Sequence, residues 1–371
     1  MSIILFLVIL AILVFVHELG HFLVAKKSGI RVDEFAIGFP PKIFSWVKGE
    51  TKYVLNLIPF GGYVKIFGEN PDEESITGPD SKRSFVNSPK WKQVSVLVAG
   101  VSMNVIFAWI LLSISLMIGN IMPIGQDGAA KYLAYSKDVK VLVTGVAPNS
   151  MAEKIGIQAG DSLFNVSSFE NTNIVSSTSP ITISRIKEIV EKSNGKDIYV
   201  SYIHSNKIKY ATTTATLINN KFAIGVYMDT VGIVKMNPFR SIWYGADLTV
   251  TSVKDVAVGL VKFIGSAVKG KANMDDVTGP VGLIGMVGQA AQFGFTYLLG
   301  FVAFISLNLA VINLLPFPAL DGGRILFVLI EAIIRRPIKP IIANTLNGLG
   351  FFLLIGLMFF ITIREVFIKF F

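Results

Sequence analysis

Two histidines and a glutamate lie close together near the start of the chain, in the order His17-Glu18-Leu19-Gly20-His21. In a helix, residues four apart lie on one face, so both imidazoles can bind one metal ion. The glutamate projects beside them, where it can take a proton from a metal-bound water. The pattern therefore predicts a zinc site that carries its own general base.

The surroundings of these residues strengthen the prediction. Residues 3–25 form an apolar segment that is long enough to span a bilayer as a helix. Ionisable side chains in such a segment are costly unless they pair, bind a ligand or line a wet cavity. The chain has three histidines, and His17 and His21 are two of them. The third, His204, is interpreted as an ordinary surface histidine of a soluble segment.

A zinc ion that keeps one position open for water needs a third protein ligand. Asp321 follows another apolar segment, in the sequence NLLPFPALDG at residues 313–322. Taken alone, this carboxylate could equally be a helix cap or an interfacial group. The topology derived below places it at the same depth as the two histidines, and two histidines with a carboxylate form a known catalytic zinc set. The sequence therefore favours Asp321 as the third ligand.

The composition excludes several classes of protein. The 371 residues are 52% apolar and 16% charged, with a mean hydropathy of +0.60. These values rule out a disordered or collagenous chain. The absence of cysteine excludes thiol catalysis, cysteine-ligated metal and disulfides. The net charge of +9 comes largely from basic residues beside apolar segments, which indicates contact with the lipid bilayer and no nucleic-acid partner.

Four apolar segments are long enough to span a membrane, and they are residues 3–25, 94–118, 295–315 and 341–363. The first has no small-residue cleavage site after it and is interpreted as a retained helix. Lys26, Lys27 and Arg31 follow this segment, so the positive-inside rule places residues 27–93 in the cytoplasm. Both termini and the long loop after residue 118 are then extracytoplasmic, and the metal site lies near the cytoplasmic side.

The long loop divides into two parts. Strands expected at residues 140–146, 197–204 and 207–217, with helices at 151–155 and 184–193, indicate a small α+β domain. Residues 241–268 have helical apolar spacing, which predicts either an amphipathic helix on the outer membrane surface or one packed on the soluble domain. The predicted regions are 1–26, 27–93, 94–118, 119–232, 233–293, 294–323 and 324–371, where the first, third and sixth contain transmembrane helices and the last contains a cytoplasmic loop followed by the fourth helix.

The two motifs together resemble those of the site-2 proteases, intramembrane zinc metalloproteases, and more closely their bacterial RseP-like branch. The order and spacing of H-E-x-x-H at residues 17–21 and N-x-x-P-x-P-x-L-D-G at 313–322 carry this resemblance. It implies cleavage of transmembrane segments in regulated intramembrane proteolysis, with Zn²⁺ held by His17, His21 and Asp321 and with Glu18 as the base. The implied location is the bacterial cytoplasmic membrane, and the implied substrates resemble anti-sigma factors or remnant signal peptides.

Smaller features extend the resemblance. Residues 53–67 look like the family's membrane-associated β-hairpin, in which Gly61 and Gly62 can turn. Such a hairpin could bind an unwound substrate by adding its backbone as a strand; a simple cytoplasmic hairpin is the alternative. Asn308 and Asn313 are expected to hold the substrate backbone or the oxyanion, or else to form hydrogen bonds between helices. The segment Thr278–Gly282 also matches the family.

The soluble part resembles a single PDZ domain, which residues 146–161 indicate by their bacterial PDZ pattern, VAPNSMAEKIGIQAGD. Such a domain could bind a peptide ligand or merely exclude bulky ectodomains. The predicted fold is thus a multi-pass α-helical membrane protein with four transmembrane helices, a membrane-associated β-hairpin and an inserted extracytoplasmic α+β PDZ-like domain. The predicted function is a zinc-dependent intramembrane endopeptidase. The alternatives are a non-catalytic metal-binding transporter and a PDZ-bearing membrane scaffold.

Overall fold

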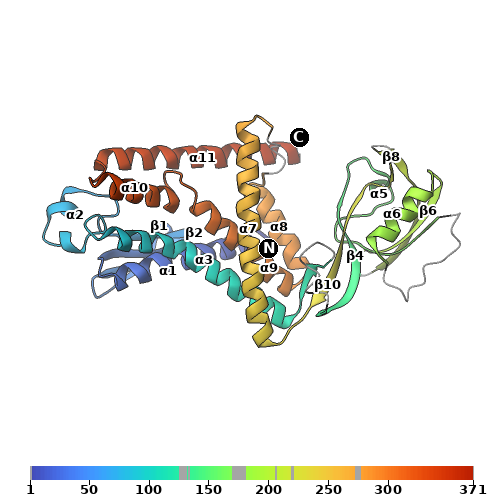
Figure 1. The fold of residues 1–371 in the computed structure, drawn as a ribbon, viewed down its shortest axis with the longest axis horizontal. Helices are drawn as coiled ribbons and strands as arrows, with labels where there is room; N and C mark the ends of the chain where they lie inside the picture. The colour runs from blue at the N-terminus through green and yellow to red at the C-terminus, as the bar shows by residue number, and fades with distance from the viewer. Residues whose placement is uncertain are drawn as a thin grey trace. The chain divides into compact units, whose positions relative to one another are not determined.

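The computed structural model describes residues 2–124, 132, 134–168, 181–204, 207–218, 221–271 and 277–370. The chain divides into two compact units (Figure 1). The first contains Met1–Ser115 and Pro238–Phe371, and the second is the insert Leu116–Asn237. The first unit carries every residue that the sequence analysis assigns to the metal site.

The four predicted spans are helices α1 (Ser2–Lys27), α3 (Lys90–Ile118), α9 (Phe295–Asn313) and α11 (Pro340–Phe370). Each is long and apolar enough to cross a membrane, which confirms a multi-pass membrane protein. The other helices of the first unit are α2 (Glu73–Thr77), the 3₁₀ helix η1 (Ser81–Arg83), α7 (Pro238–Val268), α8 (Pro280–Gln292) and α10 (Asp321–Ile334). Leu13 of α1, Ala108 of α3 and Leu307 of α9 are fully buried in one apolar cluster, which holds these spans together.

Helix α10 corrects the prediction of a cytoplasmic loop between the last two spans. The third span ends at Asn313, because Pro316 and Pro318 cannot continue the backbone hydrogen bonds of α9. The chain then starts a new 14-residue helix at Asp321. A side chain at Gly322 would lie 2.3 Å from the carbonyl oxygen of Leu314, so this restart requires glycine. Asp321 is therefore the first residue of a separate short helix.

The predicted hairpin also differs from the structure. Strand β1 (Val32–Lys48) pairs antiparallel with β2 (Thr51–Ile66), and the tight turn between them lies at residues 49–50. Phe35 lies opposite Val64 and also opposite Tyr53, so β1 sits between the two halves of β2. The halves around residues 61–62 thus pair with β1, whereas the sequence analysis paired them with each other. Large apolar side chains remain exposed on both strands, as expected for membrane association; they are Phe39, Ile43, Phe44, Trp46, Val47, Leu55, Leu57 and Ile58.

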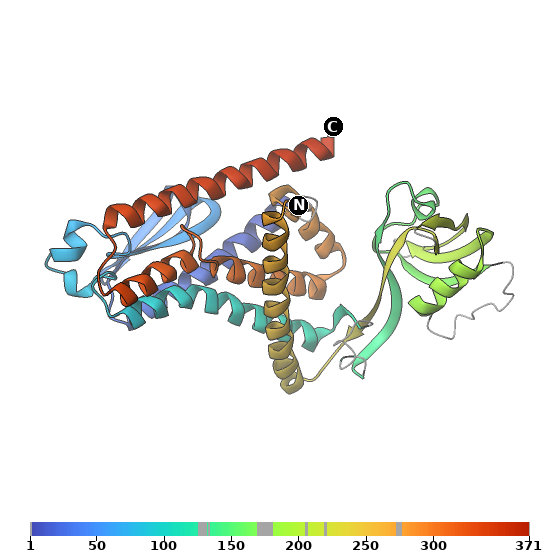
Figure 2. The ribbon, with the colours of Figure 1, turned by 45° about the horizontal axis from the view of Figure 1, so that its top comes forward.

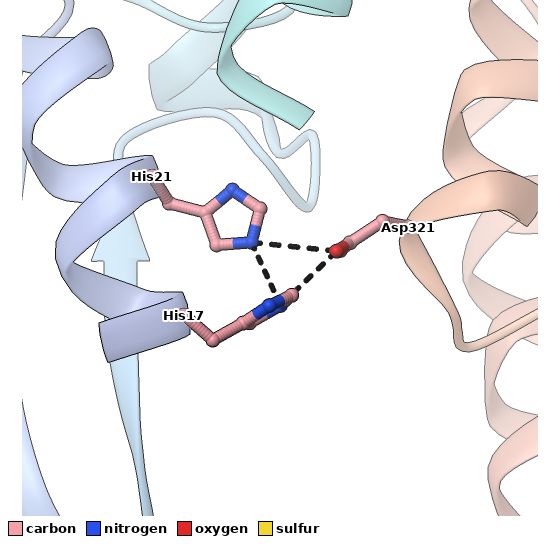
Figure 3. A group of neighbouring side chains, drawn as sticks. All are labelled: His17, His21 and Asp321. Atoms are coloured by element: carbon pink, nitrogen blue, oxygen red, sulfur yellow. Dashed lines mark hydrogen bonds and ion pairs between the residues drawn. The ribbon is translucent and has the colours of Figure 1, made fainter. Parts of the chain in front are cut away.

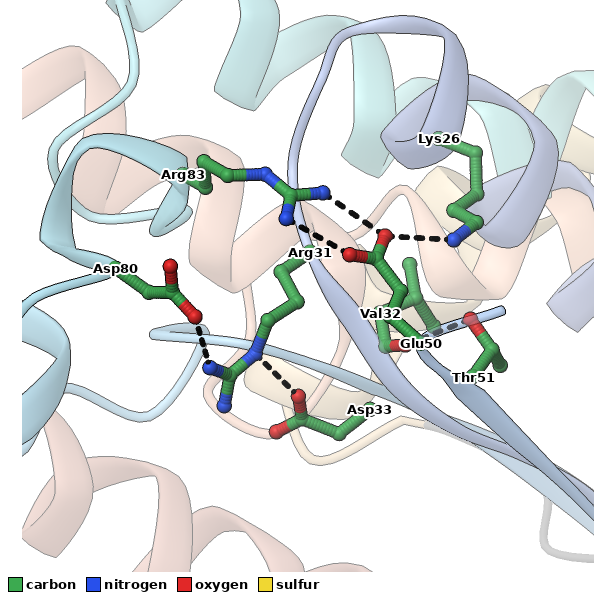
Figure 4. Close-up of polar contacts among 8 residues, drawn as sticks. All are labelled: Lys26, Arg31, Val32, Asp33, Glu50, Thr51, Asp80 and Arg83. Carbon is green, nitrogen blue, oxygen red and sulfur yellow. Dashed lines mark hydrogen bonds and ion pairs between the residues drawn. The ribbon is translucent and has the colours of Figure 1, made fainter. Parts of the chain in front are cut away.

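A network of ion pairs fixes this turn to its neighbours (Figure 4). Glu50 accepts hydrogen bonds from Lys26 at the end of α1 and from Arg83 of η1, at 2.7 and 2.9 Å. Nearby, Arg31 donates to Asp33 and Asp80. The hydrogen bonds from Arg83 and Lys26 lower the pKa of Glu50 from 4.5 to about 2. This carboxylate therefore stabilises the folded state when it is ionised.

Replacing Glu50 by Gln is expected to lower the free energy of unfolding by about 1 kcal/mol at pH 7, because the pairs are partly exposed and screened. The pKa of Glu50 is lower in the folded state, so its stabilisation is present above pH 4.5 and is lost as the pH falls towards 2. Thermal unfolding in detergent should show a difference at pH 7 that shrinks over this range. Glu73→Gln, an exposed change nearby, serves as the control. A difference that stays constant with pH would contradict the assignment.

Helix α7 packs on helices α3 and α9 of the first unit through small residues. Ser241, Gly245 and Thr249 are its buried positions, one per turn. A side chain at Gly245 would lie 2.3 Å from the hydroxyl of Ser113 on α3, and α7 also contacts α9. Close approach through small residues is typical of membrane helices. Val250, on the apolar face predicted from residues 241–268, is 70% exposed, and the position of this helix at the membrane surface stays a prediction.

The segment Thr278–Gly282 leads into α8 and receives a carboxylate from another helix. Glu365 of α11 accepts hydrogen bonds from the backbone amides of Gly279, Val281 and Gly282, at 2.6, 3.1 and 3.3 Å. A helix N-terminus favours a negative charge, so the contact ties α11 to α8. A side chain at either glycine would lie 2.7 Å from this carboxylate, which explains both glycines.

The second unit is an α+β domain built on a six-stranded sheet, in the order β3-β10-β4-β5-β6-β7 (Figure 2). The strands are β3 (Asn120–Pro123), β4 (Ser136–Val146), β5 (Ser162–Ser168), β6 (Asp197–His204), β7 (Lys207–Thr214), β8 (Thr216–Ile218), β9 (Lys221–Ala223) and β10 (Val226–Val234), with helices α5 (Met151–Lys154) and α6 (Ile183–Lys192). Ile186, Ile189 and Val190 of α6 are buried in the core, as predicted.

One detail of the second unit differs from the sequence analysis. The strand predicted at residues 207–217 is broken at the buried Ala215, after which β8 pairs with β9. His204 is partly exposed, and its Nδ1 lies 2.8 Å from Oδ1 of the buried Asp161. The PDZ-like assignment of this unit remains a prediction.

Candidate metal centre

His17 and His21 lie one turn apart on α1 and point towards Asp321 at the start of α10 (Figure 3). The two Nε2 atoms are 3.1 Å apart. Oδ2 of Asp321 lies 3.1 Å from Nε2 of His17 and 3.4 Å from Nε2 of His21. Both histidines are 7% exposed. The structure thus brings together the three residues that the sequence analysis selected as ligands.

The geometry fits a zinc ion. With Zn–N and Zn–O bonds of about 2.0–2.1 Å, two ligand atoms of a tetrahedral site lie about 3.3 Å apart. The three separations measured here scatter around this value. Oδ2 of Asp321 is also buried without a hydrogen-bond partner. A buried, unpaired carboxylate oxygen is costly, and a cation between these three atoms would satisfy it.

Two groups on α3 hold the histidines in the orientation that a metal requires. Nδ1 of His21 lies 2.8 Å from the carbonyl oxygen of Val96, so this nitrogen carries the proton and Nε2 keeps a free lone pair. Nδ1 of His17 lies 3.3 Å from the amide nitrogen of Asn104, whose oxygen has no partner. Rotating this amide by 180° would let the oxygen accept the proton of His17, so the network favours the rotated form.

Asn104 was missed by the sequence analysis, although a polar amide inside an apolar span is itself a signal. Gly100 was missed as well. A side chain at this glycine would lie 2.3 Å from Nε2 of His21 and 2.9 Å from Cε1 of His17. The backbone of α3 therefore forms one wall of the metal site. The two residues lie four apart, on the face of α3 that meets α1.

Replacing Asn104 by Ala is expected to weaken zinc binding by about 10–100-fold, the usual cost of losing a partner that orients a metal-bound histidine. Competition with a chelator of known affinity would measure the change. Asn308→Ala, another amide in an apolar span, is the control, because the Asn308 side chain bonds within its own helix. Unchanged zinc affinity in Asn104→Ala would show that Asn104 does not orient His17.

Glu18 lies beside the ligands and faces the same cavity. Its Oε2 accepts a hydrogen bond of 3.0 Å from the backbone amide of Val64 in β2, which fixes the direction of the carboxylate. The cavity has a volume of about 700 Å³ and is lined mostly by polar groups. A base that is held next to the metal ligands and reached by solvent is the arrangement that peptide hydrolysis requires.

The cavity wall on the β2 side runs from Tyr63 to Asn70. Tyr63 donates a hydrogen bond to Glu34. Burial, together with this bond, raises the pKa of Tyr63 to about 12, so the phenol stays protonated at neutral pH. Its hydroxyl is engaged by Glu34, and the backbone of Val64 is the part of this strand that contacts the base.

The four residues expected to bind substrate lie in different surroundings. The amide nitrogen of Asn313 is 3.5 Å from Nε2 of His17, next to the metal ligands. Asn308 donates instead to the carbonyl of Phe304, one turn earlier in α9. Gly61 has a φ of +104° and Gly62 packs against the carbonyl of Ala36, so both allow β2 to bend back beside β1.

The transmembrane helices and the buried His₂–Asp set with an adjacent glutamate define an intramembrane zinc metalloprotease. A sequence model described as peptidase family M50 matches residues 5–357. The chain belongs to peptidase family M50, the site-2 proteases.

Individual relatives agree with this assignment. A candidate zinc metalloprotease of Clostridium perfringens is 37% identical over 367 residues, which cover 99% of this chain and 98% of that protein. The regulator of sigma-W protease RasP of Bacillus subtilis is 29% identical over 415 residues, covering 91% and 92%. The zinc metalloprotease RasP of Bacillus licheniformis is 30% identical over 417 residues, with the same coverage. The match extends over both units, and the substrates of such an enzyme are membrane proteins.

Proposed function

We propose that His17, His21 and Asp321 hold the catalytic Zn²⁺ and that Glu18 is the general base for cleavage of transmembrane segments. The observation that carries this proposal is the convergence of three ligand atoms within 4.8 Å of one another, beside a carboxylate that faces the same cavity. Membership of peptidase family M50 favours the protease over the transporter and the scaffold. Neither of them needs a base beside an open metal position.

Each residue then has a defined task in hydrolysis. A bound Zn²⁺ supplies the Lewis acidity that activates water and polarises the scissile carbonyl. Glu18 accepts the proton of the attacking water at its carboxylate and transfers it to the leaving amine. The amide of Val64 keeps this carboxylate turned towards the cavity. Asn313, the nearer of the two asparagines, is placed to donate a hydrogen bond to the carbonyl oxygen of the substrate.

The natural substrate is proposed to be a membrane protein of the anti-sigma-factor type. The support is the similarity to the regulator of sigma-W protease RasP of Bacillus subtilis. A remnant signal peptide is the second candidate, since it is also a short membrane-spanning helix. The part of β2 around Val64, next to Glu18, is proposed to bind the unwound substrate backbone. The polar groups of that backbone cannot stay unpaired in lipid.

The proposed orientation in the bacterial cell membrane follows the positive charges. Lys26 and Lys27 end α1 on the side of the metal site, and Arg335 and Arg336 follow α10. These residues favour a cytoplasmic position for this side of the first unit. Both termini and the PDZ-like unit are then extracytoplasmic. The PDZ-like unit is proposed to bind a peptide or to exclude large ectodomains.

The proposal is tested by measuring zinc content and cleavage together. The purified protein in detergent, prepared without chelators, is incubated with a tagged anti-sigma-type segment and with a tagged remnant signal peptide. About one zinc per chain and cleavage within the apolar segment are the expected results. Cleavage of the signal peptide alone would assign the second substrate class. A protein that binds zinc but cleaves neither segment, at any detergent or lipid condition that preserves its fold, would contradict the proposed activity.

A further inference from the structure

One ion pair lies among the residues that line the catalytic cavity. Arg324 lies one turn after the ligand Asp321 on α10, and its Nη1 pairs with Glu69, which follows β2. Its Nη2 donates to the side chain of Asn70, at 3.3 Å. The guanidinium therefore binds the side chains of two consecutive residues, Glu69 and Asn70. All three side chains line the cavity that contains Glu18.

This contact lies at one end of the strand that borders the cavity. The pairing of β2 with β1 ends at Ile66, opposite Val32. The chain then turns at Gly68, with a φ of +74°, and the amide of Glu69 closes the turn on the carbonyl of Ile66. A polypeptide that lies along β2 beside Glu18 and continues past Ile66 would therefore come next to Glu69 and Arg324.

Other polar contacts hold α10 in place outside the cavity. Lys90 of α3 pairs with Glu331 near the far end of this helix. The same Glu331 accepts a hydrogen bond of 2.9 Å from the amide of Ile338. Neither Lys90 nor Glu331 lines the cavity. Helix α10 is thus anchored independently of Arg324, and the bond to Glu69 can open without releasing it.

We infer that Arg324, Glu69 and Asn70 form a strap that closes the catalytic cavity and must open to admit the polypeptide to be cleaved. This inference rests on the proposed proteolytic function. The strap narrows the path of a polypeptide to the base and the metal ligands in the resting protein, while water still reaches them. An incoming backbone displaces Glu69 and Asn70, after which the freed guanidinium can bind a carbonyl or carboxylate of the substrate.

Cross-linking tests the inference directly, because the natural chain contains no cysteine. Arg324→Cys with Glu69→Cys, joined by a bifunctional thiol reagent with a cleavable spacer, should keep its zinc and lose cleavage by at least tenfold. Releasing the spacer should restore the activity. The matched control is Lys90→Cys with Glu331→Cys, joined by the same reagent, which should cleave at the rate of its unlinked form. Equal cleavage by the linked and unlinked strap variant would overturn the inference.

Removing one charge distinguishes a strap from a purely structural tie. Glu69→Gln should retain one zinc per chain and cleave the tagged segment up to a few-fold faster than the wild type, with a lower KM. Glu73→Gln removes a neighbouring charge outside the cavity and should change nothing. If Glu69→Gln lost zinc and activity together, the pair would be a tie that positions Asp321, and the strap would be wrong. A wild type that cleaves neither segment would instead indicate failure of the proposed function.

Discussion

Glu18→Gln should lower the rate of substrate cleavage by about 10²–10⁴-fold while the protein keeps its zinc. The amide is nearly the same size as the carboxylate but cannot accept the proton of the attacking water. Its oxygen can still accept a hydrogen bond from the backbone amide of Val64, so the local structure should persist. Zinc per chain, measured by atomic absorption, and cleavage of a tagged transmembrane segment give the two readouts.

The controls for this variant use the other carboxylates of the first unit. Asp255→Asn changes an exposed position on α7 and should leave both zinc content and cleavage unchanged. Loss of zinc in Glu18→Gln would mean that Glu18 supports the metal itself. Wild-type cleavage by Glu18→Gln would remove Glu18 from the mechanism and leave the base unassigned.

Asp321→Asn should have the opposite pattern, in which zinc and cleavage are lost together. The carboxylate contributes both a ligand atom and the negative charge of the set, and its Oδ2 has no other partner to satisfy it. Losing a direct ligand should cost more than losing an orienting partner, so zinc affinity should fall by about 100-fold or more. Chelator competition measures the affinity, and the same cleavage assay measures the activity.

Excess zinc separates two explanations for such a loss. If Asp321 is a ligand, raising the zinc concentration should restore part of the metal content of Asp321→Asn. Full zinc content and normal cleavage at low zinc concentration would show that Asp321 is a helix cap rather than a ligand. An unfolded variant is recognised by its thermal transition and is replaced by Asp321→Glu, which keeps the charge.

The cluster of His17, His21 and Asp321 could be predicted because these residues leave strong signals in the sequence. Histidines four apart in a membrane span have few uses other than metal binding. Asp321 could be placed with them because the basic residues that follow the first and third spans put the ends of both spans on the same side of the membrane. The prediction did not require the exact end of α9 or the presence of α10, which is why it survived the error in that region.

Other features could not be read from the sequence for physical reasons. Helix α10 has 14 residues, too few to span a bilayer, so its apolar pattern was indistinguishable from a loop beside the membrane. The register of β1 and β2 depends on Phe35 pairing on both sides, which no local pattern encodes. The buried positions of α7 are the small residues Ser241, Gly245 and Thr249, which an apolar pattern does not single out.

The wall that Gly100 provides has a consequence for how the enzyme comes into being. His17 and His21 are made before Asp321, which follows about 300 residues later in the chain. The backbone of α3 must also reach van der Waals contact with the imidazoles before the site has its final shape. The three candidate ligands therefore cannot come together before Asp321 has been made and α10 has packed beside α1.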